Sequence, residues 1–392
     1  MEPVYIVSAV RTPIGKFGGS LADFTAADMG AIAAQAAIER AGVKPEQVEE
    51  VIIGNGRQAG GGPNVARQIG YRSGVPETSP AYTVNMACAS GLKSIALGFE
   101  SIVLGNADCV LAGGTESMSR LPYLIENARW GFRMGDQKLV DAMYRDGFMD
   151  PLSKMLMGET AEKLAGLYKI TREEQDCFGQ SSQVRAEAAS TQGLFKEEIV
   201  PIEVKEKKGT RIFDSDEHIR FGSTVESMKK LPPVFSKTGT VTAGNSSGIT
   251  DGAAATVLVS ARKVREWGLK PIARVVDYTQ VGVDPSIMGI GPVPAVRKLE
   301  AKTGWKLKDY DLVELNEAFA AQVLACDRDL HFNHDKLNIH GGAIALGHPI
   351  GCTGVRIVVT LLHALRQSGG RRGLATLCVS GGLGMALAVE MV

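Results

Sequence analysis

Short apolar runs alternate with amphipathic stretches along the first part of the chain. Residues 4–10 and 51–53 form apolar runs of strand length, and between them the spacing of apolar positions predicts a helix over 25–40 that Gly42 ends. A continuous apolar run is typical of a strand that is covered on both faces, as in a parallel sheet. The alternation of such strands with helices therefore predicts an α/β fold with buried parallel strands.

The next unit carries a cysteine just ahead of a helix. We predict a helix over 91–104 and a buried strand over 109–112 that Gly113 and Gly114 stop. Cys88 lies before this helix, among small side chains that leave room for a ligand at its sulfur. The free N–H groups and the dipole of a helix N-terminus stabilise negative charge, so we expect the pKa of the Cys88 thiol to be lowered.

The middle of the chain has a different composition. Between about 120 and 247, charged and aromatic residues intermingle, and two helices (159–168 and 172–190) look amphipathic. The run 205–208 is charged and loop-like. We interpret this region as an insertion, because apolar strand-like runs then return at 253–259, 272–276, 312–315 and 374–379.

The two parts that flank the insertion resemble each other. Three short segments, at 51–55, 88–93 and 110–114, match 312–316, 352–356 and 377–382 in the same order and at a nearly constant offset. A duplicated α/β half-domain is the economical explanation. Its two copies are expected to pack face to face around a shared pocket at the strand ends.

Charge and cysteine content narrow the function classes. The chain of 392 residues has 43 basic and 43 acidic side chains, so no overall field favours nucleic acid or an anionic membrane. Its six cysteines are spread singly, unlike a disulfide framework or a Cys-x-x-Cys metal site. No apolar run approaches the ~20 residues that span a bilayer, and the first residues do not resemble a signal peptide. We therefore expect a cytoplasmic protein that binds neither nucleic acid nor membrane.

Four separated segments stand out by their cysteine, histidine, asparagine and glycine content. They are NMACASG (85–91), NEAFA (316–320), GGAIALGHPIGCTG (341–354) and CVSGG (378–382). In this order they resemble the thiolase family, and the likeness extends over nearly the whole chain. The resemblance implies two duplicated α/β half-domains packed in layers (αβαβα) with an inserted loop domain. The implied boundaries are 1–119 plus 248–271 for the N-terminal half, 120–247 for the insertion and 272–392 for the C-terminal half.

The resemblance implies a role for each residue that matches a motif. Cys88 corresponds to the acylated nucleophile, His348 to its base, and Cys378 to the second thiol that exchanges a proton with substrate carbon. Asn316 would hold a water that forms one oxyanion hole with His348, and the main-chain N–H groups of Cys88 and Ser380 would form the other. Position 380 is usually glycine in the acetoacetyl-CoA type, and serine narrows the allowed φ and ψ.

Further matches concern coenzyme A and the acyl chain. Arg220 corresponds to an arginine near the 3′-phosphate ADP head, and Ser247 to a contact of the pantetheine arm. Where acetoacetyl-specific members carry a histidine, this chain has Leu156, which favours longer 3-ketoacyl chains, whereas Phe148 could fill the same space. The remaining walls of the site correspond to Met157, Ala243, Met288, Ala318 and Phe319.

The other cysteines are expected to be structural. We predict that Cys109 and Cys177 are buried strand cysteines, and that Cys326 and Cys352 also lack a catalytic role. His331, His334 and Asp335 might suggest a metal, yet they have no further ligand at zinc spacing, so a solvated loop is favoured.

The resemblance predicts a reversible reaction through an acyl-Cys88 intermediate. Either two acetyl-CoA give acetoacetyl-CoA and CoA, or a 3-ketoacyl-CoA and CoA give an acyl-CoA and acetyl-CoA. Acyl-CoA and CoA are the expected ligands, with no metal or other cofactor. The alternatives are a ketoacyl synthase of the same superfold and a non-catalytic protein that binds acyl-CoA; the presence of Cys88, His348 and Cys378 together argues against the non-catalytic protein, and Cys378 and Asn316 argue against the synthase.

A homodimer or homotetramer is also implied by the resemblance. The segment 120–138 contains Tyr123, Trp130 and Phe132, which suit a contact between subunits. Burial of these rings within one subunit explains them equally well.

Overall fold

Ten strands join into one mixed sheet in the computed structural model, which describes residues 2–392. The N-terminal half contributes β1 (Val4–Arg11), β3 (Glu50–Gly54), β4 (Ala81–Val84), β5 (Cys109–Ser117) and β10 (Thr250–Ser260), with the short β2 (Gly15–Lys16) beside β10. The C-terminal half contributes β11 (Ala273–Gly282), β12 (Leu312–Leu315), β13 (Arg372–Val379) and β14 (Leu383–Met391). The strand order is β12-β13-β14-β11-β1-β10-β5-β3-β4, and a short pairing of β1 with β11 joins the halves.

The two halves repeat the same pairing scheme. β5 lies parallel to β3 and antiparallel to β10, which pairs antiparallel with β1. In the same way, β13 lies parallel to β12 and antiparallel to β14, which pairs antiparallel with β11. The prediction of buried parallel strands is confirmed for β3, β4 and β5 and for β12 and β13, but not for β10 and β14, which run against their neighbours. Both strands are almost wholly buried, so their apolar runs look like those of parallel strands.

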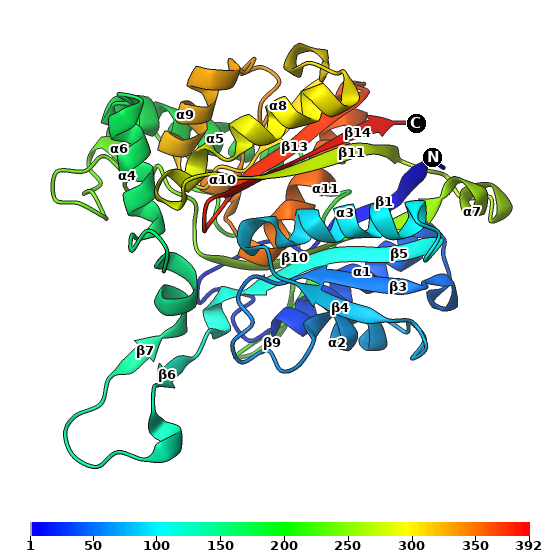
Figure 1. Ribbon diagram of the computed structural model, residues 1–392, viewed down its shortest axis with the longest axis horizontal. Coiled ribbons are helices and arrows are strands. Elements are labelled where there is room, and N and C mark those ends of the chain that lie inside the picture. The colour runs from blue at the N-terminus through cyan, green and yellow to red at the C-terminus, as the bar shows by residue number, and fades with distance from the viewer. Residues whose placement is uncertain (1) are drawn as a thin grey trace.

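Helices separate and cover the two halves of the sheet (Figure 1). The helices α3 (Ser90–Val103) and α11 (Ile350–Ser368) lie between the halves. On the outer faces lie α1 (Ala26–Ala41) and α2 (Val65–Arg72) for the N-terminal half, and α8 (Pro292–Thr303) and α9 (Ala320–Leu330) for the C-terminal half. This is the predicted αβαβα order of layers. Within residues 2–392, none of the helices combines the length and the apolar character needed to cross a membrane.

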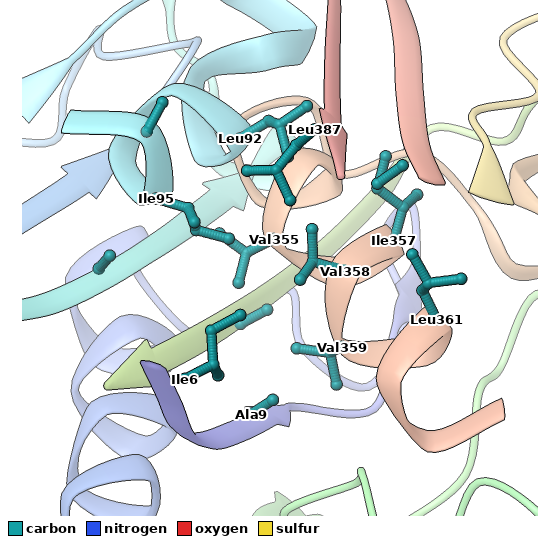
Figure 2. Close-up of a cluster of buried hydrophobic side chains, with 14 of the residues drawn as sticks. Ile6, Ala9, Leu92, Ile95, Val355, Ile357, Val358, Val359, Leu361 and Leu387 are labelled. Carbon is teal, nitrogen blue, oxygen red and sulfur yellow. The ribbon is translucent and has the colours of Figure 1, made fainter. Parts of the chain in front are cut away.

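A continuous apolar core holds the central helix layer together (Figure 2). Leu92 and Ile95 of α3 and Val355 and Val358 of α11 belong to this core, and all four side chains are fully buried. Gly91 permits the close approach of the helices, because a Cβ there would lie 2.8 Å from a main-chain oxygen of α11. The N-terminal ends of α3 and α11, and the loops that precede them, are thereby brought together.

The predicted ends of one helix are confirmed, whereas the predicted end of one strand is wrong. The helix predicted over 25–40 is α1, with Thr25 as its N-cap and Gly42 as a left-handed C-cap. The strand predicted to stop at Gly113 and Gly114 instead continues to Ser117 as β5. A Cβ on Gly114 would lie 2.3 Å from a main-chain oxygen of α11, so close helix packing rather than a turn explains Gly114.

Strand register corrects one of the three repeat matches. Gly54 pairs with Gly114 in the first half, and Leu315 pairs with Thr376 in the second. Since Gly54 and Leu315 each precede the asparagine of their repeat, Gly114 is equivalent to Thr376. The predicted match of Gly114 with the glycines after β13 is therefore wrong.

Between β5 and β10 the chain leaves the sheet. Its elements are β6 (Tyr123–Ile125), β7 (Leu139–Asp141), α4 (Met157–Leu167), α5 (Arg172–Thr191), β8 (Ile202–Glu206), β9 (Gly209–Phe213) and α6 (Val225–Lys229). β6 and β7 form a two-stranded arm that projects from the body of the protein (Figure 1). The run 205–208, predicted as a loop, is the end of β8 and the turn of its hairpin with β9. Two short helices, α7 (Ala261–Glu266) and α10 (Ala343–Leu346), lie outside this region.

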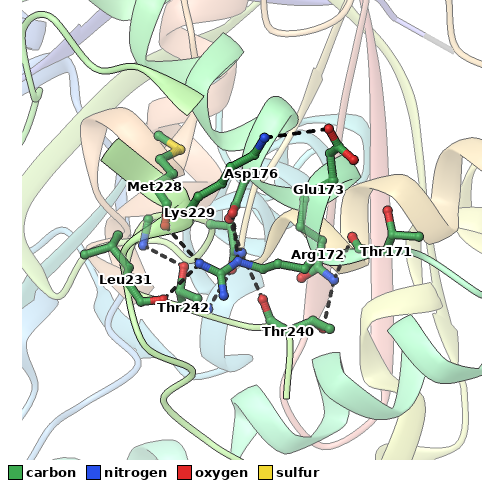
Figure 3. Close-up of polar contacts among 12 residues, drawn as sticks. Thr171, Arg172, Glu173, Asp176, Met228, Lys229, Leu231, Thr240 and Thr242 are labelled. Atoms are coloured by element: carbon green, nitrogen blue, oxygen red, sulfur yellow. Dashed lines mark hydrogen bonds and ion pairs between the residues drawn. The ribbon is translucent and has the colours of Figure 1, made fainter. Parts of the chain in front are cut away.

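A polar network ties α5 to the segment that leads back to β10 (Figure 3). Arg172 donates from Nη2 to the carbonyl oxygens of Met228 and Leu231, both at 2.9 Å, and from Nε to Asp176 at 2.7 Å. The other carboxylate oxygen of Asp176 accepts from Asn245 Nδ2 at 2.9 Å. These bonds satisfy carbonyls in the last turn of α6 and just beyond it, and they fix the segment around Asn245 against α5.

Candidate active site

A cavity of about 470 Å³ lies where the N-terminal ends of α3 and α11 meet the insertion. Cys88, His348, Cys378 and Ser380 all line it, although they come from distant parts of the chain. Every residue predicted to contact coenzyme A or the acyl chain also lines it, namely Phe148, Leu156, Met157, Arg220, Ala243, Ser247, Met288, Ala318 and Phe319. Asn316 is the exception, since it is fully buried and is not part of the lining.

Cys88 and His348 are within hydrogen-bond reach of each other. Cys88 lies in the helical turn Ala87–Ala89 directly before α3, and His348 lies two residues before α11. His348 Nε2 is 3.3 Å from Cys88 Sγ. Gly347 has φ +102°, and a Cβ there would lie 2.3 Å from Thr250, so this turn requires glycine.

Thr353 determines which nitrogen of His348 faces the thiol. The Thr353 hydroxyl donates to the Pro349 carbonyl at 3.0 Å, so its oxygen accepts from His348 Nδ1 at 2.7 Å. Nδ1 then carries the proton and Nε2 presents its lone pair to Cys88. Burial lowers the pKa of His348 to about 3, and nearby arginines act in the same direction. The imidazole is therefore neutral near pH 7 and can accept a proton.

The expected lowering of the Cys88 pKa is wrong. Burial raises the pKa of this thiol, and Glu116 acts in the same direction. Arg57 and the main-chain N–H groups of Ser380 and of Cys88 itself oppose the rise without cancelling it. Desolvation of a thiolate therefore outweighs the stabilisation offered by the helix N-terminus. The resting pair is a neutral thiol that faces a neutral imidazole.

Cys378 lies near the end of β13 and lines the same cavity. Its side chain is 1% exposed. Burial raises the pKa of the Cys378 thiol well above its usual value, and Cys88 contributes in the same direction. Two thiols in one cavity thus have different surroundings, and Cys378 holds its proton more firmly at rest.

The two residues predicted to support oxyanion holes are held differently. Neither Nδ2 nor Oδ1 of Asn316 has a hydrogen-bond partner within residues 2–392, although the side chain is fully buried. A buried amide without partners is costly, which suits a group that binds water or ligand. Ser380 does not have a positive φ, so serine is unstrained there, and its main-chain N–H acts to lower the pKa of Cys88.

One wall of the cavity joins the insertion to the C-terminal half. The N–H of Ser247 donates to the Ala318 carbonyl at 3.0 Å, and Ser246 forms a bridge with Phe319. Asn245, held by the network around Asp176, accepts from a main-chain N–H of α9. Main-chain hydrogen bonds therefore place the predicted coenzyme A contacts against the predicted acyl-pocket residues.

The residues predicted to set chain length face the cavity from the insertion. Leu156 directly precedes α4, and Phe148 ends a helical turn that begins at Tyr144. The rings of Tyr144 and Phe148 pack edge to face with centroids 5.6 Å apart. The apolar Leu156 and the bulky Phe148, which were predicted to have opposite effects on chain length, thus line one pocket.

Comparison with known proteins identifies a single family over the whole chain. Residues 4–262 match the family model for the thiolase N-terminal domain, and residues 269–391 match that for the thiolase C-terminal domain. The chain belongs to the thiolase family. Its enzyme class, an acyltransferase, follows from this membership.

Relatives of this thiolase include acetyl-CoA acetyltransferases and a 3-ketoacyl-CoA thiolase. It is 52% identical to an acetyl-CoA acetyltransferase of Cupriavidus necator over 391 residues, which cover 100% of both chains. A crystal structure of the Bacillus anthracis acetyl-CoA acetyltransferase superposes with a TM-score of 0.98 at 45% identity, covering 100% of this chain and 99% of that one. The crystal structure of human mitochondrial 3-ketoacyl-CoA thiolase in complex with CoA superposes with a TM-score of 0.97 at 46% identity. The match covers 100% of this chain and 98% of that one. The thiolase fold is therefore shown.

Sequence reasoning missed several residues that line the thiolase cavity. Arg57 and His218 add polar groups, the exposed Lys16 adds a cation, and the exposed Phe17 adds an aromatic ring. His218 Nδ1 lies 3.0 Å from the Ala345 carbonyl, which leaves Nε2 for the cavity. Only His218 carried a usable signal, as one of six histidines and a close neighbour of a predicted site residue.

Three of the four cysteines predicted to be structural are buried in this thiolase. Cys109, Cys326 and Cys352 are inaccessible, and burial raises the pKa of Cys326 and Cys352 to about 12. Cys177 is exposed on α5, so its prediction as a buried strand cysteine is wrong. It lies within the stretch 172–190, which was itself predicted to be a helix and is α5.

Proposed function

We propose that this thiolase catalyses thiolysis of 3-ketoacyl-CoA to acyl-CoA and acetyl-CoA, and the reverse condensation, with acetoacetyl-CoA as one substrate. The observation that carries the proposal is the Cys88–His348 pair, 3.3 Å apart, in one cavity with Cys378. A thiol beside a base suits acyl transfer, and a second buried thiol suits proton exchange with carbon. The scheme uses no metal and no further cofactor.

In the first half-reaction of thiolysis, His348 Nε2 takes the Cys88 proton as Sγ attacks the 3-keto carbon. The main-chain N–H groups of Cys88 and Ser380, which act to lower the pKa of the thiol, are suited to stabilise the resulting oxyanion. The carbon–carbon bond then breaks, and the electron pair passes to the enolate of acetyl-CoA. Cys378 donates its proton to the enolate carbon, and acetyl-CoA leaves behind acyl-Cys88.

In the second half-reaction, free CoA gives its thiol proton to the Cys378 thiolate. The CoA sulfur attacks acyl-Cys88, and the Cys88 sulfur leaves while it recovers its proton from His348. All protons are thereby returned to their starting groups. Asn316, whose buried amide has no partner within residues 2–392, is proposed to hold a water against the thioester oxygen of the enolate.

Coenzyme A is proposed to bind in the cavity against the wall that contains Ser247 and Ala318. The human relative binds CoA in its crystal structure. Arg220 lines the cavity with an exposed side chain, which suits the phosphates of the nucleotide head. Ser247 is suited to the pantetheine arm, and His218 Nε2 is a further polar group along the same cavity.

Acetyl-CoA alone is expected to acetylate a single cysteine, Cys88, because acyl transfer precedes any encounter with the second substrate. The measurement is peptide mass spectrometry of acid-quenched protein. Cys88→Ala should abolish the label, and Cys352→Ala, which changes the equivalent residue of the other repeat, should retain it. A label on Cys352 in the parent protein would refute the assignment of the nucleophile.

Leu156 is expected to extend thiolysis to substrates of at least six acyl carbons. Leu156→His should shift preference toward acetoacetyl-CoA, since one such contact is worth about 1–3 kcal/mol, or roughly ten- to two-hundred-fold in relative kcat/KM. The test is a chain-length series of 3-ketoacyl-CoA substrates. Activity confined to acetoacetyl-CoA in both proteins would show that Phe148 and pocket volume set the specificity.

The chain is proposed to assemble into homodimers or homotetramers. On the arm formed by β6 and β7, Tyr123 is 64% exposed and Trp130 is 87% exposed, and Phe132 is also exposed. These rings are therefore not buried within one subunit, which was the alternative that the sequence left open. Exposed aromatic residues on a projecting arm are typical of a contact between subunits.

A further inference from the structure

Arg57 is a cationic side chain buried in the wall of the thiolase cavity. It follows β3 in a segment that carries no motif, and it is 9% exposed. Its Nη2 donates to the Gly147 carbonyl at 2.9 Å and its Nη1 to the Gly56 carbonyl at 3.4 Å, whereas Nε has no partner within residues 2–392. The acceptors of its side-chain hydrogen bonds are thus main-chain carbonyls rather than carboxylates, and the carboxyl groups of Glu116 and Asp146 interact with its charge without a hydrogen bond to the guanidinium.

The charge of Arg57 acts on the nucleophile. Among the groups that lower the pKa of Cys88, Arg57 is the strongest. The other titratable groups that face Cys88 are His348, which is neutral, Cys378, which holds its proton, and Glu116, whose pKa burial raises to about 7. Arg57 is therefore the cation that most strongly stabilises a thiolate at Cys88.

The same guanidinium supports the wall of the acyl pocket. Gly147 directly precedes Phe148 in the helical turn that begins at Tyr144. A Cβ on Gly147 would lie 2.7 Å from Arg57 Nε, so the guanidinium packs directly against the main chain of this turn. The hydrogen bond to the Gly147 carbonyl then fixes the position from which Phe148 enters the cavity.

We propose that Arg57 is a positioning residue with two linked effects: its charge stabilises the Cys88 thiolate, and its contact with Gly147 holds Phe148 in place as the acyl-pocket wall. One side chain then couples the reactivity of the nucleophile to the choice of chain length. The chain-length part rests on the proposed function. The thiolate part does not, because thiol reactivity can be measured without a CoA substrate.

Two substitutions separate the effects. Arg57→Leu removes the charge and the hydrogen bond, whereas Arg57→Lys keeps the charge but lacks the planar fork that reaches the Gly147 carbonyl. We expect Arg57→Leu to raise the pH midpoint of Cys88 alkylation by iodoacetamide by about one unit, which is roughly tenfold slower alkylation below the midpoint. Arg57→Lys should leave the midpoint near that of the parent. Both should change the ratio of kcat/KM for six-carbon over four-carbon substrates by about threefold or more.

Arg185→Leu is the matched control. Arg185 also donates to two main-chain carbonyls, those of Leu337 and His334, but it does not line the cavity. Both readouts should stay at the parent values in this variant. Gly147→Ala keeps Arg57 but displaces its guanidinium. It should therefore change the alkylation midpoint and the chain-length ratio in the same directions as Arg57→Leu.

The two readouts also distinguish the possible failures. An unchanged alkylation midpoint in Arg57→Leu overturns the proposal, and so does an unchanged chain-length ratio in an active variant. Equal changes in Arg185→Leu would overturn it as well, because they would reflect general loosening of the fold. A parent protein that is alkylated at Cys88 but cleaves no 3-ketoacyl-CoA would refute the proposed function, while the midpoint would still decide the role of the Arg57 charge.

Discussion

Cys378→Ala is expected to abolish carbon–carbon bond cleavage and formation while acetylation of Cys88 survives. Only the step at the substrate carbon needs this thiol, because His348 already serves Cys88 at 3.3 Å. Loss of a general acid or base costs roughly 10²–10⁴ in rate, and we expect the upper part of this range because, within residues 2–392, the only other thiol that lines the cavity is Cys88, which carries the acyl group. The measurements are acetoacetyl-CoA formation from acetyl-CoA and, in parallel, the extent of Cys88 acetylation.

Cys326→Ala is a suitable control for this experiment. Cys326 is also fully buried, but it lies on α9 and does not line the cavity. Its replacement should leave both half-reactions near the parent rate. Condensation by Cys378→Ala at the parent rate would show that the two-thiol mechanism is wrong for this protein.

His348→Ala is expected to slow acetylation of Cys88 about a thousandfold, because the raised pKa of Cys88 leaves little thiolate without a base. Thr353→Val should cost roughly tenfold, since Nδ1 loses the acceptor that orients the ring. Thr353→Ser keeps this hydroxyl and should stay near the parent rate. Single-turnover acetylation followed by mass spectrometry measures all three, and equal rates in the valine and serine variants would contradict the assignment of the tautomer.

The low pKa of His348 predicts how the rate of Cys88 acetylation depends on pH below neutrality. A base works only when it is unprotonated, and the pKa of this ring is lowered to about 3. Acetylation of Cys88 should therefore show no loss from histidine protonation as the pH falls from 7 to 5. Glu116 titrates in this range because burial raises its pKa to about 7, so the profile should be compared with that of Glu116→Gln. An acid limb near pH 6.5 in both proteins would contradict a buried neutral histidine.

Much of the fold was predictable because its signals are local. The helix 25–40 carries a capping threonine and a terminal glycine, and both are found in their expected roles at α1. The internal repeat predicted two half-domains packed against each other, and the resemblance to thiolases implied their arrangement in layers. Strand direction was not predictable, because β10 and β14 are as buried as parallel strands and only pairing with distant residues shows their orientation.

The candidate site divides in a similar way. Motif residues such as Cys88, His348 and Cys378 were identified from the sequence, and the structure brings them into one cavity. Arg57 and His218 were missed, because each lies outside a motif and reaches the cavity only through the packing of segments that are far apart in the chain. Their chemistry is that of ordinary surface residues until the fold buries them.

The sequence by itself determined the residue types that carry the chemistry, the elements that present them and the family to which the chain belongs. These depend on local propensity and on motifs that are contiguous in the chain. Only the tertiary structure decided the electrostatics, since the pKa of Cys88 depends on burial and on Arg57 and Glu116, neither of which is its neighbour in sequence. It also decided that Trp130 faces outward rather than into the core. Desolvation and charge act through space, so they could be evaluated only when the segments around the thiol had been placed.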